Sequence, residues 1–453
     1  AIGYMMWEEL KKVSKARIKR GEFREITKDH IINQVKNAIE FNKTNFGLFN
    51  AFLGRRVGDR VVGYTLSPKY SKMLNERLSV GRVQSPAVRL IVEREREILN
   101  FKPMPYYVLS ALLEKDGIKF TATYEKSRID DKKEAERIYN EIKDEKVAIV
   151  EKVEKRETRQ SPRPPFTTST LQQSANSVYK FSPERTMSLA QDLFESGLIT
   201  YHRTDSTRLS DQAIEGIRKL IEREYGKEYL PQKPRTYKSK NTQADAHEGI
   251  RITHFIPLKD QEKLIKEKGL TEDHFKLLKL IYERTVACQM EDAVYDKTVF
   301  ILKIKDHTFK ASGSILKFKG FKAVFQYEIE TEKEGEEEEN QNQTLPNLKQ
   351  SDKAQVIKVN NTEKFTQPPP RYTEASLVKK LEDLGIGRPS TYASIIKTIK
   401  DRGYVINEKG KLKPSEKAMK LIDALKEKDA LSLIHISTKE MEEFLDKVEE
   451  NKA

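Results

Sequence analysis

The sequence predicts a multidomain α+β protein in which mainly helical and β-rich segments follow one another along the chain. Its 453 residues are enough for roughly three domains of the usual size. Most of the chain shows helical periodicity, whereas residues 106–153 and 297–329 contain runs with the period-two alternation of strands. Because a long helical stretch separates the two β-like regions, we expect the chain to leave the β-rich domain and return to it.

The amino-terminal third predicts helices followed by strands. Residues 1–20 read as one amphipathic helical segment, and residues 21–103 alternate helix signals with basic pairs, which predicts the first part of a helical domain. Residues 104–161 predict the first part of the β-rich domain. The proline cluster SPRPPF then marks a boundary, because the residue before a proline is disfavoured in the helical conformation. The apolar residues at helical spacing in the first segment are Ile2, Met5, Met6, Leu10 and Val13.

The rest of the chain repeats this alternation. Residues 162–288 predict a mainly helical domain built around one strand, GLITY at 197–201. Residues 289–360 return to period-two patterning and complete the β-rich domain. Within them the run at 331–343 is acidic and poor in apolar residues, which indicates a solvated loop. Residues 361–453 return to helices and complete the first helical domain.

The charge balance favours a polyanionic partner. The formal net charge is +14 and the pI is about 9.3, and the basic clusters lie among aromatic and small polar residues. Nucleic acid fits this distribution better than a membrane, because no apolar run approaches the ~20 residues of a spanning helix and the amino end lacks the features of a signal peptide. We therefore expect a soluble, cytoplasmic protein.

The chain contains one cysteine, Cys288. A single cysteine excludes an internal disulfide and a cysteine-ligated zinc ribbon within this chain. Because it stands in the segment YERTVACQM, we expect a small buried side chain there.

The segment GLITYHRTDST, residues 197–207, places an isolated tyrosine hydroxyl beside a histidine, an arginine and an aspartate. A phenol with a pKa near ~10 is a poor nucleophile unless positive charge favours its phenolate. Arg203 can supply that charge and bind phosphate oxygens, and on a strand it would project from the same face as Tyr201. The segment therefore favours phosphoryl transfer to Tyr201. The alternative is an ordinary strand tyrosine followed by a helix cap.

Four further segments follow a family pattern. They are SVGRVQSPAVRLIVEREREI (79–98), PPFTTSTLQQ (164–173), AHEGIR (246–251) and TQPPPRYTEASLVKKLEDLGIGRPSTYASIIKTIKDRGYV (366–405). Together with GLITYHRTDST, in this order, they closely resemble the type IA DNA topoisomerases, and bacterial topoisomerase I most of all. The resemblance covers nearly the whole chain. It implies a toroid-like core with mainly helical DNA-binding domains and a β-rich arch domain.

The resemblance also implies a chemistry. The Tyr201 oxygen attacks a backbone phosphorus of single-stranded DNA and leaves a 5′-phosphotyrosine with a free 3′-hydroxyl. Resealing reverses this step, so no ATP is required. Arg203 and His247 are implied to contact the scissile phosphate, although the family's usual AHEAIRP reads AHEGIRI here.

Magnesium belongs to the implied parent enzyme. In the resembled family, two aspartates and a glutamate of the Toprim domain hold Mg²⁺ and immediately precede a segment like AIGYMMWEEL. The chain begins at that segment, so we expect residues 1–20 to be a residual tail of the Toprim domain. The magnesium ligands and the carboxy-terminal zinc modules of many relatives would then lie outside this sequence, and we predict no metal ligand within it.

Three residues are predicted to support the active site. Asp205 can cap the following helix while orienting Arg203, and we favour the cap. Glu248 follows His247, and Arg20 in RGEFREIT matches an arginine near the family's active site, with a solvent-exposed arginine as the alternative. Three other histidines are interpreted as packing or hydrogen-bonding residues. These are His202, His254 and His435.

Strand binding is assigned to arginines with neighbouring polar and aromatic residues, because guanidiniums neutralise phosphates and tyrosines stack on unpaired bases. In GRPSTY, Pro389 fixes φ while Ser390 can cap the next helix and point its amides at a phosphate. For each arginine the alternative is a solvated helix face. The predicted DNA-binding residues are Arg55, Arg56, Asp59, Arg60, Tyr64, Arg82, Gln84, Ser85, Arg388, Ser390, Thr391 and Tyr392.

Two functions remain open from the sequence. The first is the core of a type IA topoisomerase, a nucleoid-associated monomer that relaxes negatively supercoiled DNA at single-stranded regions, with relaxation impaired in this chain because the metal-binding acids are absent. The second is a catalytically inactive scaffold that binds single-stranded DNA through its basic surface. A covalent adduct with an oligonucleotide distinguishes them.

Overall fold

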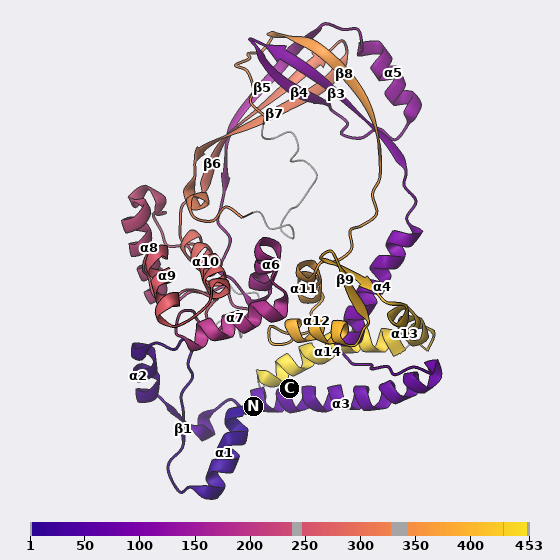
Figure 1. The fold of residues 1–453 in the computed structure, drawn as a ribbon. Helices are drawn as coiled ribbons and strands as arrows, with labels where there is room; N and C mark the ends of the chain where they lie inside the picture. Colours follow the sequence, from indigo (N-terminus) through magenta and orange to yellow (C-terminus); the bar gives the residue numbers. More distant parts are fainter. Residues whose placement is uncertain (1, 238–246, 328–342, 429, 451–453) are drawn as a thin grey trace.

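The computed structural model describes residues 2–237, 247–327, 343–428 and 430–450, and their elements form a ring (Figure 1). A β-barrel occupies one end of the ring, and two helical bodies occupy the other. Extended segments join the barrel to each body. The bodies meet where α6 (Thr168–Tyr179) packs against α11 (Glu374–Asp383). The expected multidomain α+β architecture is therefore confirmed.

The barrel consists of six antiparallel strands in the closed order β3-β4-β7-β6-β5-β8. Both β-like regions of the sequence contribute to it, because β3 pairs with β8 and β5 pairs with β6. The acidic run predicted as a solvated loop lies outside the described residues except for Gln343. The strands are β3 (Pro105–Lys115), β4 (Ile118–Tyr124), β5 (Val147–Gln160), β6 (Ala293–Ile304), β7 (His307–Phe318) and β8 (Lys353–Phe365).

Strand alternation fills the barrel interior. In β3, Leu109, Ala111 and Leu113 are fully buried, while the residues between them are partly exposed. Phe120 and Phe300 meet edge to face inside, with ring centroids 6.0 Å apart. Helix α5 (Lys132–Ile142) contributes to the same core through the buried side chains of Ala135, Ile138 and Ile142.

The first helical body carries the predicted nucleophile. Its helices begin at residues that satisfy free backbone amides. Thr167 and Thr170 form a capping box at α6, and Ser182 accepts a hydrogen bond from the Arg185 amide. The other elements are α7 (Pro183–Glu195), α8 (Asp211–Tyr225), η2 (Lys227–Tyr229), α9 (Leu258–Glu267), α10 (Glu272–Ala287) and η4 (Gly320–Ala323). Cys288 lies fully buried in its core, as expected.

The second helical body combines segments from both ends of the chain. Helix α14 lies on α3, and glycines on α3 make room for it. A Cβ on Gly58 would lie 2.4 Å from Met441 Cε, and one on Gly54 would lie 3.0 Å from Leu445 Cδ2. The elements are α3 (Phe46–Leu74), α4 (Gln84–Asn100), α11, α12 (Tyr392–Asp401), β9 (Val405–Glu408), β10 (Lys411–Pro414), α13 (Glu416–Glu427) and α14 (Ala430–Glu449).

The amino-terminal residues form a separate small group of elements. The expected single helix over residues 1–20 is wrong in length, because α1 ends at Val13 and residues 19–20 pair as a strand with residues 39–40. Trp7 stacks on Phe41 with ring centroids 4.6 Å apart. The elements are α1 (Ile2–Val13), β1 (Lys19–Arg20), α2 (Lys28–Lys36), β2 (Ile39–Glu40) and η1 (Phe41–Lys43).

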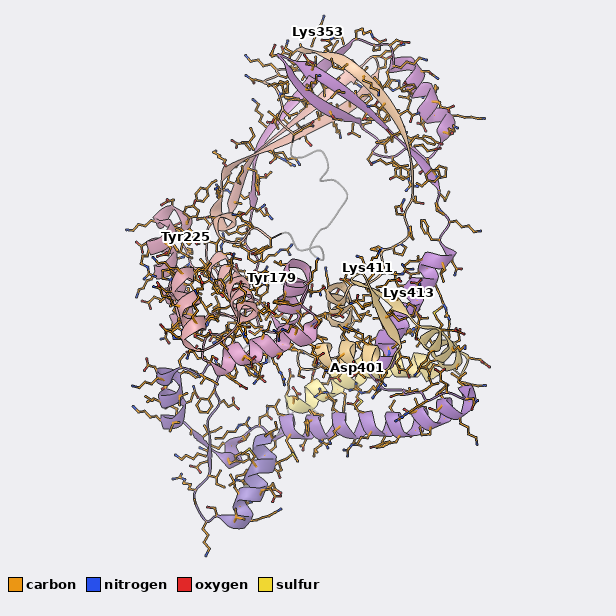
Figure 2. All side chains as sticks on the ribbon, in the orientation of Figure 1. Tyr179, Tyr225, Lys353, Asp401, Lys411 and Lys413 are labelled. Atoms are coloured by element: carbon orange, nitrogen blue, oxygen red, sulfur yellow. The ribbon has the colours of Figure 1, made fainter. Side chains whose placement is uncertain are left out.

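Figure 2 shows the side chains of both bodies, with Tyr179 and Tyr225 on the first and Asp401, Lys411 and Lys413 on the second. Each body has its own hydrophobic core. Across the described ranges, no helix has the length and apolar character needed to cross a membrane.

The aromatic pair of the barrel provides a stability test. Phe300→Ala should lower the free energy of unfolding by about 3–5 kcal/mol, because it removes a ring that is 1% exposed and leaves a cavity beside Phe120. Ile315→Ala on β7, where the side chain is 71% exposed, should change it by less than about 0.5 kcal/mol. Urea unfolding measures both, and equal losses would contradict the assigned core.

Candidate active site

The segment that carries Tyr201 is a braced loop. Ile199 forms a single isolated bridge with Ile252, and the backbone of Thr200 still pairs with that of Arg251. The Tyr201 amide then turns to another partner and donates to the Arg24 carbonyl at 2.8 Å. The prediction of a strand through Tyr201 was therefore wrong, and so was the argument that strand geometry places Arg203 on the same face. The strand pairing ends at Thr200 because Thr200 pairs with Arg251, whereas the next residue, Tyr201, pairs with Arg24 on a different segment.

The Tyr201 side chain is half-buried against two rings. Phe194 and His202 each lie with ring centroids 5.3 Å from that of Tyr201, both in tilted or edge-on geometry. Gly197 opens the loop at φ +75°, and a Cβ there would lie 2.4 Å from the Ile26 carbonyl oxygen. Only glycine permits both the conformation and this close approach. The loop is thus held against residues 24–26 on one side.

A buried guanidinium braces the other side of the loop. Arg251 is 5% exposed and pairs bidentately with Glu248, through Nη2–Oε2 at 2.6 Å and Nε–Oε1 at 3.2 Å. Its Nη2 also donates to Glu25 Oε2 at 3.1 Å. The Arg251 amide donates to Thr200 Oγ1 at 2.9 Å, and Thr200 Oγ1 donates to the Gly249 carbonyl at 2.8 Å. Arg251 therefore connects residue 25, the AHEGIR segment and the residue before Tyr201.

Glu248 is consequently a buried, ionised support. Burial alone would raise the pKa of its carboxyl, but the charge and hydrogen bonds of Arg251 outweigh burial and hold that pKa below its ordinary value. Its Oε1 also accepts a hydrogen bond from the Ser210 amide at 2.6 Å. Because Ser210 caps α8, Glu248 joins the AHEGIR segment to the start of that helix. Its predicted supporting role remains a prediction, with these contacts in its favour.

The two predicted phosphate contacts lie on these braced segments. Arg203 and His247 are both exposed, so their side chains are accessible to a large ligand. Arg20 on β1 is partly exposed and forms an ion pair with Glu22 at 3.2 Å. It lies four residues before Arg24, whose carbonyl accepts the hydrogen bond from the Tyr201 amide. The structure thus brings the Arg203 and His247 segments together through the Thr200 and Arg251 contacts.

The capping prediction for Asp205 was wrong. Helix α8 begins at Asp211, and its cap is Ser210, whose Oγ accepts from the Ala213 amide at 3.3 Å. The segment from Thr204 to Ser206 has a local hydrogen-bonded turn instead, in which Thr204 Oγ1 accepts from the Ser206 amide at 3.0 Å. Burial and the charge of Glu382 raise the pKa of Tyr392, and the charge of Asp205 raises it further. Asp205 therefore lies where the two helical bodies meet.

His202 is a packing residue, as interpreted from the sequence. It is fully buried, and neither ring nitrogen has a hydrogen-bond partner in the described chain. Burial, and secondly the nearby Arg203 charge, lower its pKa to about 4. His254 is half-buried, with Nδ1 2.9 Å from Thr253 Oγ1. The His435 side chain lies outside the described residues.

The predicted DNA-binding residues lie on the second helical body. Arg56, Arg60 and Tyr64 are exposed on α3, and Tyr64 is 77% exposed. The Gln84 side-chain amide donates a hydrogen bond to Ser79 Oγ, and Ser85 Oγ accepts one from the Gly81 amide at 3.1 Å. The buried members of the set are Arg82, Ser85 and Tyr392.

The predicted Ser390 cap was also wrong. Helix α12 begins at Tyr392, and the preceding residue, Thr391, has a helical backbone and makes no side-chain cap bond to the helix. Thr391 Oγ1 instead accepts from the Arg388 amide at 2.8 Å. Because Thr391 closes this turn onto Arg388, Ser390 does not stand at the start of the helix.

Several of the predicted strand-binding arginines are already paired. Arg55 and Arg82 both donate to Glu442 on α14, and Arg82 also donates to Asp59. Sequence reasoning missed Glu442, which lies 387 residues beyond Arg55. It also assigned no role to Arg251 or Glu25. The Glu248–Arg251 spacing of three is the one local signal for this network.

Comparison with known proteins assigns the family. A model of the DNA topoisomerase family matches residues 43–453, and the chain therefore belongs to this family of isomerases. DNA topoisomerase 1 of Aquifex aeolicus is 40% identical over 462 residues, covering 100% of this chain and 80% of that protein. DNA topoisomerase 1 of Rickettsia felis is 43% identical over 440 residues, covering 92% of this chain and 55% of that protein.

A solved structure has the same fold. Full-length topoisomerase I from Thermotoga maritima matches with a TM-score of 0.83 and 36% identity, covering 99% of this chain and 72% of that one. The resemblance to bacterial topoisomerase I and the toroid-like α+β class are thereby confirmed. The chain spans about half the length of the Rickettsia relative.

The buried histidine predicts a pH dependence. Because the pKa of His202 falls from an ordinary value near ~6.5 to about 4 on folding, the unfolded chain binds the proton more tightly, and stability should decrease as the pH falls from about 6.5 to about 4. His202→Leu should remove about 2–3 kcal/mol of this acid-dependent loss by pH 4.5. Urea unfolding at several pH values measures it, and parallel curves for the two proteins would contradict it.

Proposed function

We propose that this chain is the core of a type IA DNA topoisomerase that cleaves and reseals one DNA strand through Tyr201 without ATP. The observation that carries the proposal is the bracing of the Tyr201 loop. Hydrogen bonds to Arg24 and around Arg251 hold its backbone on two sides, while the tyrosine ring stays partly accessible. A nucleophile must be held in one geometry relative to its target for efficient attack.

The chemistry proposed for the residues follows from their exposure and charge. The Tyr201 oxygen loses its proton and forms a bond to phosphorus, while the bond between that phosphorus and the 3′ oxygen breaks and the 3′ oxygen takes up a proton. One phosphodiester therefore replaces another, and a free 3′-hydroxyl is left. Arg203 is exposed on the same loop and can bind the phosphate oxygens, where charge develops during transfer. His247 is exposed on the AHEGIR segment and can contact the same phosphate. Resealing is the reverse reaction.

Magnesium is proposed for the parent enzyme only. Among the described residues, no group of three or more His, Cys, Asp or Glu side chains is arranged to hold a metal ion. The two carboxylates that brace the loop, the partly exposed Glu25 and the buried Glu248, are both paired with Arg251. The residues present therefore do not fit a magnesium site, and no step of this proposal passes through the metal. We infer that relaxation by this chain alone is impaired, while strand binding is retained.

A single-strand binding scaffold without catalysis is the second candidate. The exposed arginines and tyrosine of α3, together with the net charge of +14, favour binding of a single strand in either case. The substrate proposed for both functions is a single-stranded region of DNA. The two differ only in whether Tyr201 becomes esterified.

A covalent trap tests the proposal. Single-stranded oligonucleotides labelled at the 5′ or the 3′ end are incubated with the chain, denatured and separated by electrophoresis. We expect a protein adduct that carries only the 3′ label, since Tyr201 would hold the 5′ phosphate of the downstream fragment. Tyr201→Phe should remove the adduct and leave the affinity for the strand within about twofold. The reason is that positively charged side chains supply most of the affinity for DNA phosphates, and the neutral Tyr201 hydroxyl adds no charge.

A matched variant controls for loss of a hydroxyl. Tyr225→Phe removes the phenolic hydroxyl of Tyr225, which is half-buried in the same helical body (Figure 2), and should leave any adduct unchanged. Adduct formation by Tyr201→Phe would refute the nucleophile. Strand binding without an adduct from the chain joined to a magnesium-binding domain of a relative would favour the scaffold.

A further inference from the structure

Three arginines from distant segments converge on one carboxylate of α14. Glu442 is 2% exposed. Its Oε2 accepts from Arg55 Nη2 at 2.8 Å, and its Oε1 accepts from Arg82 Nη2 at 2.9 Å. Arg388 Nη2 lies 3.6 Å from Oε2. All three arginines belong to the set that the sequence assigns to strand binding.

The guanidinium charges of this cluster are paired. Asp59 accepts from Arg82 Nε at 2.7 Å, and Asp446 accepts from Arg388 Nη2 at 2.8 Å. Each of the three guanidiniums therefore has a carboxylate partner among Glu442, Asp59 and Asp446, and the Glu449 carboxyl lies close enough to interact with Arg55 and Arg388. A strand phosphate that approaches these arginines meets a site already neutralised by the protein.

The position of Glu442 is fixed by packing. Met441 and Leu445, on the same helix, lie close against Gly58 and Gly54 of α3, where the absence of a Cβ leaves room for their side-chain ends. The carboxylate is also ionised. Burial alone would raise the pKa of Glu442, but hydrogen bonding and charge from Arg55, with the charges of Arg388 and Arg82, keep that pKa below its ordinary value.

We propose that Glu442 is an internal counter-anion, which occupies the place of a strand phosphate among Arg55, Arg82 and Arg388 and limits the affinity of this chain for single-stranded DNA. The inference rests on the proposed function in one respect, namely that the polyanion bound by these arginines is a DNA strand.

The chemistry of the two anions is interchangeable. A carboxylate and a phosphodiester each present two oxygens that share a negative charge, and guanidinium binds either through parallel N–H donors. Arg55 and Arg388 keep 24% and 27% of their side chains exposed, whereas Arg82 keeps 3%. The exposed pair can therefore turn to a phosphate while Arg82 stays with Asp59. The free energy gained in such an exchange is only the difference between a guanidinium–phosphate contact and the guanidinium–carboxylate contact that it replaces. These arginines therefore bind a strand weakly.

The test replaces the carboxylate by an amide. Glu442→Gln keeps the shape and removes one negative charge, which leaves one guanidinium charge for a phosphate. One additional neutralised phosphate makes the salt slope of binding steeper by about 0.7, which corresponds to about fivefold tighter binding at 0.1 M salt. Fluorescence anisotropy of a labelled twelve-residue oligothymidylate over a salt series measures both.

The neighbouring residue supplies the matched control. Glu443→Gln removes the same charge from the same helix, but the Glu443 side chain is 59% exposed and pairs with Lys439 at 3.8 Å. Glu443→Gln should change the affinity for the oligonucleotide by less than about twofold, because exposed charges are screened by salt. If Glu442→Gln binds no more tightly than Glu443→Gln, or more weakly than the unchanged chain, the inference is overturned.

Three further outcomes are decisive. If Glu442→Gln does not fold, Asp446→Asn, whose carboxylate is 39% exposed and pairs with Arg388, replaces it and should tighten binding by about two- to fivefold. No tightening in that variant overturns the inference. Failure of the unchanged chain to bind the oligonucleotide would instead refute strand binding itself, and with it both the proposed function and the inference. Normal binding, with no adduct even from the chain joined to a magnesium-binding domain of a relative, would leave the inference standing and refute catalysis.

Discussion

The Arg251 network is the interaction on which the arrangement around Tyr201 depends. One buried guanidinium pairs with Glu248 and Glu25, and the same residue's backbone and the Thr200 hydroxyl hold the loop. A buried ion pair contributes little net stability once its desolvation is counted, but removing one partner leaves an unpaired buried charge. The network therefore matters for position more than for stability. It specifies which segments meet, and the residue at that meeting point is the one that the sequence marks as a nucleophile.

Part of the positive charge of the chain is neutralised locally by internal carboxylates. A net charge of +14 predicts strong attraction to any polyanion, yet Arg55, Arg82 and Arg388 each have an internal carboxylate partner. Overall charge governs long-range attraction, whereas local charge pairing governs how tightly the strand is held once it arrives. A protein that must bind a strand and also release it benefits from separating these two properties. The pairing at α14 provides that separation in the proposed function.

Sequence reasoning succeeded where the determinants are local. The sequence predicted the strand alternation in β3, which depends on neighbours within a few residues. It failed where the partner is distant in sequence. The Tyr201 loop ends its pairing at Thr200 because residue 24 intervenes, and nothing near position 201 encodes that contact. The pairing of Arg55 with Glu442 spans 387 residues, so a pattern of arginine pairs could not distinguish phosphate ligands from internal ion pairs.

The contacts between the two helical bodies include polar ones, whereas the interior of each body is a hydrophobic core. Their buried hydrophobic clusters have no residue in common. Polar contacts link them, among them Ser169 Oγ donating to Glu382 Oε2 at 2.6 Å and an ion pair of Lys397 with Glu184. Water can replace polar contacts of this kind at a net cost of about 1 kcal/mol each, whereas separating a shared core would expose apolar surface at ~25 cal/mol per Å². Tyr201 and Asp205 stand on one side of these contacts. If Tyr201 holds a cut strand end, as proposed, the ring can therefore open where the tyrosine-bearing body meets its neighbour while each body keeps its core.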